Sequence, residues 1–227
     1  MINRLSKQKS RTSSPSASKP AATRAVVETK TAVTMQVERL QASDWTARSA
    51  AAAELGKLGD RQATKALSTA LRDSAAEVAR EAAAALGRLR DVAAVEALAA
   101  VVVNADGYFD WSVRVAAANS LGQLQDRRTV EVLIATVRDQ AAEVSEAAVR
   151  ALGLLGDERA AEPLAAIVRN QSNYFLPGVR QAAVEALGHL RVPTARESLR
   201  KIAADAHIDP TVRQAAGAAL AVTSSTN

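Results

Sequence analysis

Few side chains in this chain of 227 residues could support acid–base, nucleophilic or metal chemistry. It has no cysteine and two histidines, His189 and His207. The lack of thiols excludes a thiolate nucleophile, a zinc–thiolate site and a disulfide framework. His207 lies between Asp205 and Asp209, but one imidazole beside two carboxylates is more typical of a solvated turn than of a metal site. We therefore expect no catalytic residue, no bound cofactor and no metal.

Regularly spaced acidic residues have a structural interpretation instead. Three aspartates each stand four residues before an arginine, namely Asp44 before Arg48, Asp110 before Arg114 and Asp209 before Arg213. Opposite charges at i and i+4 near the start of a helix pair readily. Arg180 occupies the same position in another copy of this pattern but has Leu176 in place of the aspartate. We expect a ladder of structural ion pairs that is interrupted at Arg180.

The dipeptide Leu-Gly recurs at a regular spacing. Its copies are Leu55-Gly56, Leu86-Gly87, Leu121-Gly122, Leu152-Gly153 and Leu187-Gly188, with a degenerate sixth copy at Leu220-Ala221. Successive copies are 31, 35, 31, 35 and 33 residues apart. Self-similarity at this period is typical of stacked helical units rather than of one globular core.

Each unit has the pattern of two amphipathic helices, and the fourth unit shows it best. Positions i, i+3, i+4 and i+7 of its first helix are the apolar residues Val130, Leu133, Ile134 and Val137. A second stripe follows at Val144, Ala148, Ala151, Leu152 and Leu155. Neither stripe is buried unless neighbouring units stack. The sequence thus predicts an all-α fold, a right-handed α-solenoid of about six antiparallel helix pairs over residues 31–222.

A family becomes recognisable in the recurring string Val-Arg-x-Ala-Ala-x-x-x-Leu-Gly, which begins at Val113 and again at Val179. This string resembles the HEAT repeat, and in particular the short HEAT-like repeat named after phycobilisome lyases. The resemblance implies an armadillo-type superhelix in which the Asp and Arg residues above form an inter-repeat ladder. Lyase subunits, iron-containing hydroxylases and plain scaffolds share this repeat. The His-Glu pairs of the hydroxylases are not matched here, because Leu190 follows His189 and Ile208 follows His207.

Every aromatic residue lies in the turn between the first and second helix of the first, third or fifth unit. The six residues are Trp45, Tyr108, Phe109, Trp111, Tyr174 and Phe175, and we call them the rim. Equivalent turns of a solenoid share one edge, so the rim residues are predicted to line that edge. They either anchor a binding partner or fold back as small cores within their loops, with Asp44, Asp110 and Asp209 capping the helices that follow.

The net charge is unevenly distributed. Residues 1–30 carry a charge of +6, whereas residues 31–227 carry −1. The first segment is rich in Ser, Pro and basic residues and poor in apolar ones, which predicts a disordered tail over residues 1–30. A disordered C-terminal end is expected at 223–227. We expect a cytoplasmic protein without a transmembrane segment, although a basic, Ser-rich start is also compatible with an organelle transit peptide.

Two functions fit these observations. The first is a non-enzymatic scaffold that binds another protein through its concave face and the rim. The alternative is a phycobilin lyase or chromophore-handling subunit that acts with a partner subunit, in which the rim would stack on a tetrapyrrole. Specific nucleic-acid binding is not expected, because the second helices show no continuous basic stripe and the repeats are nearly neutral.

The composition of the tail leads to a first prediction. Deleting residues 1–24 should leave the thermal unfolding midpoint within about 2 °C of the full chain, because a segment with few apolar side chains buries little surface. Differential scanning calorimetry of the two chains measures this. A much larger decrease would show that the tail packs on the repeats.

Overall fold

The computed structural model describes residues 30–171 and 173–224, so most of the predicted tail and C-terminal end lie outside it. The described residues form helices and connecting turns, without strands. None of these helices is both long enough and apolar enough to cross a membrane. The first helices of the successive units are residues 30–39, α3 (Thr64–Ala70), α5 (Val95–Val103), α7 (Val130–Thr136), α9 (Ala161–Arg169) and α11 (Pro193–Ala204).

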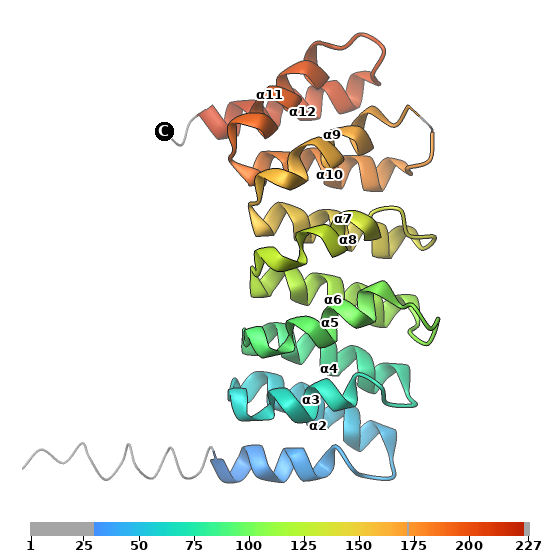
Figure 1. Ribbon diagram of the computed structural model, residues 1–227, viewed down its shortest axis with the longest axis vertical. Coiled ribbons are helices and arrows are strands. Elements are labelled where there is room, and N and C mark those ends of the chain that lie inside the picture. The colour runs from blue at the N-terminus through green and yellow to red at the C-terminus, as the bar shows by residue number, and fades with distance from the viewer. Residues whose placement is uncertain (1–29, 172, 225–227) are drawn as a thin grey trace, which may run out of the picture.

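The second helices are longer and more uniform. They are α2 (Trp45–Leu58), α4 (Ala76–Leu89), α6 (Trp111–Leu124), α8 (Ala142–Leu155), α10 (Pro177–Leu190) and α12 (Pro210–Ser224). Each packs on the second helix of the next unit, so that the pairs stack along the long axis of the molecule (Figure 1). The predicted solenoid of helix pairs is confirmed, while its handedness remains a prediction.

Short 3-10 turns connect most units: η1 (Arg61–Ala63), η2 (Val92–Ala94), η3 (Arg127–Thr129) and η4 (Glu158–Ala160). Each is preceded by an aspartate whose carboxylate accepts the amide N–H two residues later, as Asp60 does from Gln62 at 2.9 Å. Gly59 ends α2 with φ 69°, a left-handed conformation that glycine adopts without strain. These local signals end one unit and begin the next.

The recurrent Leu-Gly pair forms the interface between neighbouring second helices. The leucines at positions 55, 86, 121, 152 and 187 are all within 1% of complete burial. The glycines allow close approach: a Cβ built on Gly56, Gly122 or Gly153 would lie 2.9 Å from a backbone Cα of the next second helix. Any side chain larger than hydrogen at these three positions would push the two helices apart.

The last interface, between α10 and α12, is looser than those before it. A Cβ on Gly188 would lie 3.4 Å from the Cβ of Ala219, which is an ordinary van der Waals contact. The sixth copy of the dipeptide, Leu220-Ala221, is also less buried than its predecessors. The array is therefore packed less closely at its C-terminal end than at the interfaces of Gly56, Gly122 and Gly153.

These two glycines form a matched pair for a stability test. Gly153→Ala should destabilise the protein by roughly 1–3 kcal/mol, because the new methyl group meets the backbone of Ala186. Gly188→Ala should be neutral or stabilising by up to about 1 kcal/mol, because alanine favours the helix and its methyl group has room. Urea unfolding monitored by circular dichroism measures both. Equal effects at the two sites would contradict this account of the spacing.

Candidate protein-interaction surface

The turns that carry the aromatic residues lie on one edge of the array, at the right of Figure 1. Trp45 and Trp111 are the first residues of α2 and α6, and Asp44 and Asp110 are the N-caps of these helices. Asp110 accepts the amide N–H of Ser112 at 2.8 Å. Hydrogen bonds from the Thr46 side chain and amide lower the pKa of Asp44, so its carboxylate stays ionised in this position. The predicted caps are confirmed.

Two of the rim residues belong to the hydrophobic core. Phe109 and Phe175 retain only 7% and 8% of their accessible surface. The Asn104 side chain brackets the backbone of Phe109, accepting from its N–H at 2.8 Å and donating to its carbonyl at 3.2 Å. Asn170 holds Phe175 in the same way, at 2.9 and 3.0 Å. These phenylalanines anchor the long turns from inside.

The two tyrosines connect their turn to the preceding unit. The Tyr108 hydroxyl donates to the carbonyls of Arg72 and Asp73 at 3.1 and 3.2 Å, and its ring meets that of Phe109 edge-on at 5.1 Å. The Arg72 guanidinium lies 5.3 Å from the centre of each ring, a cation–π geometry. Tyr174 makes the equivalent contacts with the turn at Arg138, at 2.8 and 3.3 Å. We call these contacts the tyrosine latches.

The arginine ladder has partners other than those expected. Arg48 forms a bidentate pair with Asp73 of the next unit, at 2.6 and 2.7 Å, rather than with Asp44. Arg114 pairs with Asp139 of the next unit through Nη2 alone, and its buried Nε has no hydrogen-bond partner among the described residues. The i,i+4 expectation failed because the aspartate at each helix start is already occupied as an N-cap, whereas stacking brings the next turn within reach.

The ladder changes at Arg180, but not for the reason that the sequence suggested, because Arg48 and Arg114 do not pair with the aspartate that Leu176 replaces. Here the guanidinium donates from Nε and Nη2 to the carbonyl of Val168, at 3.1 and 3.0 Å. Asp209 in the following turn caps α12 through the amide of Thr211 at 2.8 Å, which confirms its predicted capping role. Arg213, one turn into α12, is partly buried.

Four of the six rim residues are half exposed at the surface. Trp45, Tyr108, Trp111 and Tyr174 are between 46% and 51% exposed. The tyrosines combine a structural hydroxyl contact with an accessible ring face. The tryptophans stand at helix starts where the fifth and sixth units place Pro177 and Pro210, so an aromatic ring is not needed there for folding.

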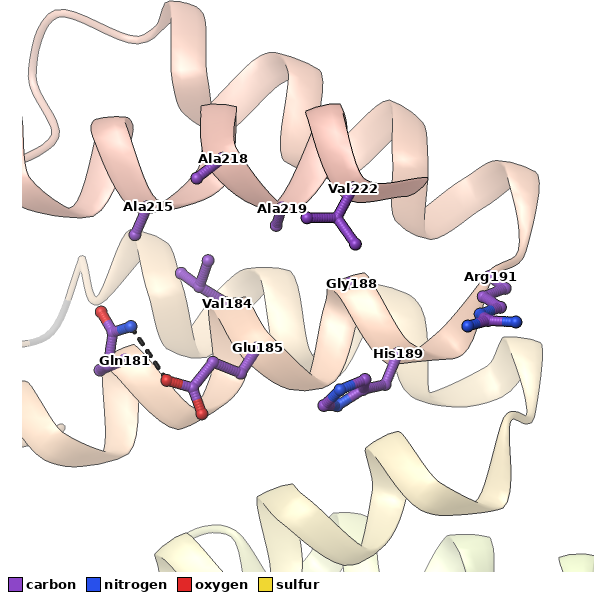
Figure 2. A pocket seen from close by; sticks show the side chains of 10 residues that line it. All are labelled: Gln181, Val184, Glu185, Gly188, His189, Arg191, Ala215, Ala218, Ala219 and Val222. Atoms are coloured by element: carbon purple, nitrogen blue, oxygen red, sulfur yellow. Dashed lines mark hydrogen bonds between the residues drawn. The ribbon is translucent and has the colours of Figure 1, made fainter. Parts of the chain in front are cut away.

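Grooves lie between neighbouring second helices in the described part of the chain. One lies between α10 and α12 and encloses about 570 Å³. Figure 2 shows its apolar side, formed by alanines and Val222 of α12 facing Val184 and Gly188 of α10, and its polar side, where Gln181 donates to Glu185 at 3.1 Å near His189. The looser packing at Gly188 opens this groove.

The second groove, between α4 and α6, encloses about 410 Å³. Two arginines of α4, Arg80 and Arg88, and Trp111 of α6 line it together with small and neutral polar side chains: Ala84, Ser112, Val115, Ala116, Asn119, Ser120 and Gln123. Arg80 and Arg88 lie 3.2 and 4.0 Å from the same carboxylate, that of Glu81. One anion therefore faces two cations here.

The residues considered for chemistry do not assemble into a site. His207 is exposed in the last long turn, where its amide donates to Asp205 at 2.9 Å, and His189 lies at the edge of the α10–α12 groove. Within the described part of the chain, no three His, Cys, Asp or Glu side chains are grouped so as to hold a metal ion.

Sequence reasoning missed several residues of this surface, although a signal for them was present. Asp73, Arg72 and Asn104 recur two units later as Asp139, Arg138 and Asn170. This period of 66 residues is the sum of one short and one long unit. It marks the residues that build the turns, and it separates them from those that vary between copies.

The geometry defines the chain as a helical repeat solenoid with an aromatic edge. Residues 35–109 and 105–176 match the family model for HEAT repeats, and residues 179–205 match that for the PBS lyase HEAT-like repeat. The chain therefore belongs to the HEAT repeat family, and its segment 179–205 has the phycobilisome-lyase type of repeat that the sequence pattern resembles. No curated protein sequence matches it.

Solved structures show the same architecture. One chain in the structure of the complex of CpcE and CpcF of phycocyanin lyase from Nostoc sp. PCC7120 is 26% identical to this chain. The match covers 94% of this chain and 79% of that chain, with a TM-score of 0.57. An archaeal HEAT-like repeats protein from Thermococcus onnurineus NA1 is 16% identical, with 92% and 94% covered and a TM-score of 0.55. A designed armadillo repeat protein is 18% identical, with 83% and 98% covered and a TM-score of 0.53.

The ladder leads to a pH-dependent prediction. The hydrogen bond from Arg48 lowers the pKa of Asp73, so this pair contributes stability that is present above about pH 4 and is lost as the pH falls through the lowered pKa. Asp73→Asn should lower the free energy of unfolding by roughly 1–3 kcal/mol at pH 7. The difference in this free energy between the variant and the unaltered chain should become smaller as the pH falls. Urea unfolding at several pH values measures this.

The control is Asp106→Asn at the exposed Arg72–Asp106 pair, whose nitrogen–oxygen distance is 2.8 Å. Solvent screens the attraction within an exposed pair, so this variant should change stability little at any pH. A loss at Asp73 that stays constant from neutral to acid pH would show that the ion pair is not its source.

Proposed function

We propose that this chain is a non-enzymatic scaffold that holds another protein against its second helices and its rim. The observation that carries the proposal is the set of four half-exposed aromatic rings on one edge. Tryptophan and tyrosine are enriched among the residues that dominate protein–protein binding energy. Large, half-exposed rings at three of the repeat turns are otherwise costly surface for a protein in water.

Two further observations support a binding role over catalysis. The groove between α4 and α6 is lined by the rim residue Trp111, and another groove lies between the second helices α10 and α12. The ionisable side chains whose pKa is shifted are mostly aspartates engaged as caps or in ion pairs, such as Asp44 and Asp73, which is a structural use of charge. Specific nucleic-acid binding is not part of this proposal.

The alternative is a chromophore-handling subunit that acts with a partner, with a tetrapyrrole against the rim. The observation that favours it is the similarity to the CpcE and CpcF complex, together with the match of residues 179–205 to the PBS lyase HEAT-like repeat. An absorption spectrum of the purified chain separates the two. A visible band from co-purified pigment would support the alternative, whereas colourless protein that retains a protein partner supports the scaffold.

The rim is tested with two substitutions at each tyrosine. A pull-down with mass spectrometry first identifies the partner. Tyr108→Ala and Tyr174→Ala, which remove the rings, should then weaken its binding about thirtyfold, since losing a binding hot spot costs about 2 kcal/mol. Tyr108→Phe and Tyr174→Phe remove only the latch hydroxyls, so they should lower stability by about 1 kcal/mol and leave affinity unchanged.

Isothermal titration calorimetry gives the affinity and circular dichroism the fraction folded. If the alanine variants lose stability but bind the partner as tightly per folded molecule as the unaltered chain, the rim serves only its own loops. That outcome would remove the rim from the proposed function.

A further inference from the structure

Comparing residues 66 positions apart distinguishes the side chains that the fold requires from those that can vary. The turn residues that form the latches and hold the phenylalanines recur 66 positions later, as Asn104, Tyr108 and Phe109 do in Asn170, Tyr174 and Phe175. The groove between α4 and α6 is different, because its counterpart between α8 and α10 has Glu146 for Arg80, Leu154 for Arg88 and Pro177 for Trp111. The same architecture forms with either set, so the fold does not require Arg80, Arg88 or Trp111.

The counterpart side chains even lie in the same places. The Arg88 side chain passes over Gly56, because a Cβ built there would lie 2.6 Å from the Arg88 Nε. Leu154 passes over Gly122 in the same manner, with its Cδ1 3.2 Å from a Cβ built on that glycine. An arginine and a leucine thus fill one structural position, and only the arginine adds charge beside a groove.

We infer that the α4–α6 groove, lined by Arg80, Arg88 and Trp111, binds an acidic peptide segment of a partner protein, with an apolar side chain against Trp111. This inference rests on the proposed function and names the chemistry of the partner. Carboxylates pair with guanidinium groups through short, charge-assisted hydrogen bonds. Trp111 is 51% exposed at the mouth of the groove and supplies apolar contact area.

The charges around the groove favour an anionic occupant. Arg80 and Arg88 are 46% and 42% exposed, and the single carboxylate of Glu81 serves both of them. The groove-lining residues include no acidic side chain. A nucleic acid fits less well, because its binding needs an extended track of cations along many phosphates, whereas residues 31–227 carry a net charge of −1. A short acidic segment needs only these two arginines.

The experiment starts from a phage-displayed random peptide library selected on the full chain. Enriched peptides should carry Asp or Glu next to an aromatic or aliphatic residue. One such peptide is then synthesised, labelled with fluorescein and titrated by anisotropy at low and high salt. Its affinity should fall as salt rises, because the pairing is partly exposed to solvent.

Two variants take the residue types of the second copy. Arg80→Glu and Trp111→Pro should each weaken the peptide at least about tenfold, while circular dichroism remains that of the unaltered chain. Both are expected to fold, since Glu146 and Pro177 occupy the equivalent positions. The control is Arg150→Glu on α8, which changes the net charge as Arg80→Glu does and should leave the affinity within about twofold.

Several results would overturn the inference. They are the enrichment of neutral or basic peptides, no enrichment at all, an equal loss at Arg150→Glu, or an oligonucleotide that binds the unaltered chain but not Arg80→Glu. Peptides that bind the chain and ignore the groove variants would overturn this site while leaving the scaffold proposal intact. The tyrosine variants above test the scaffold separately, because the latches lie outside this groove.

Discussion

The close approach of neighbouring second helices is the constraint on which the rest of this structure depends. A glycine at the centre of each interface lets the next helix come so near that no Cβ fits between them at Gly56, Gly122 and Gly153. The adjacent leucine fills the space beneath. Because this contact recurs along the array, small shifts would add up from unit to unit. The regular spacing of the turns at the rim follows from it.

Stacking at this distance also determines how the turns interact. Arg48 and Arg114 reach forward to an aspartate of the next unit, and each tyrosine reaches back to the carbonyls of the preceding one. Together they connect three successive units through side chains at the edge, in addition to the apolar contacts within. The short units supply the acceptors and the long units supply the tyrosines, so the two-unit period is a physical period as well as a sequence one.

The difference between recurring and varying residues explains how one fold can carry a specific surface. Residues that recur at 66 positions hold the turns and the helices in place. Residues that differ between copies, such as Arg80 and Glu146, lie on the second helices beside grooves or exposed faces. A repeat protein can change these without losing its architecture, since each unit contacts mainly its neighbours.

The sequence by itself determined the helix pairs, the caps at Asp44 and Asp110 and the burial of the Leu-Gly leucines, because these depend on contacts within a few residues or on the repeat period. It did not determine which carboxylate Arg48 would take, or that Phe109 would be buried while Tyr108 stays half exposed. Those outcomes depend on where stacking places one turn against the next. Local spacing can propose an ion pair, but only the packed array shows which partner is already occupied and which lies within reach.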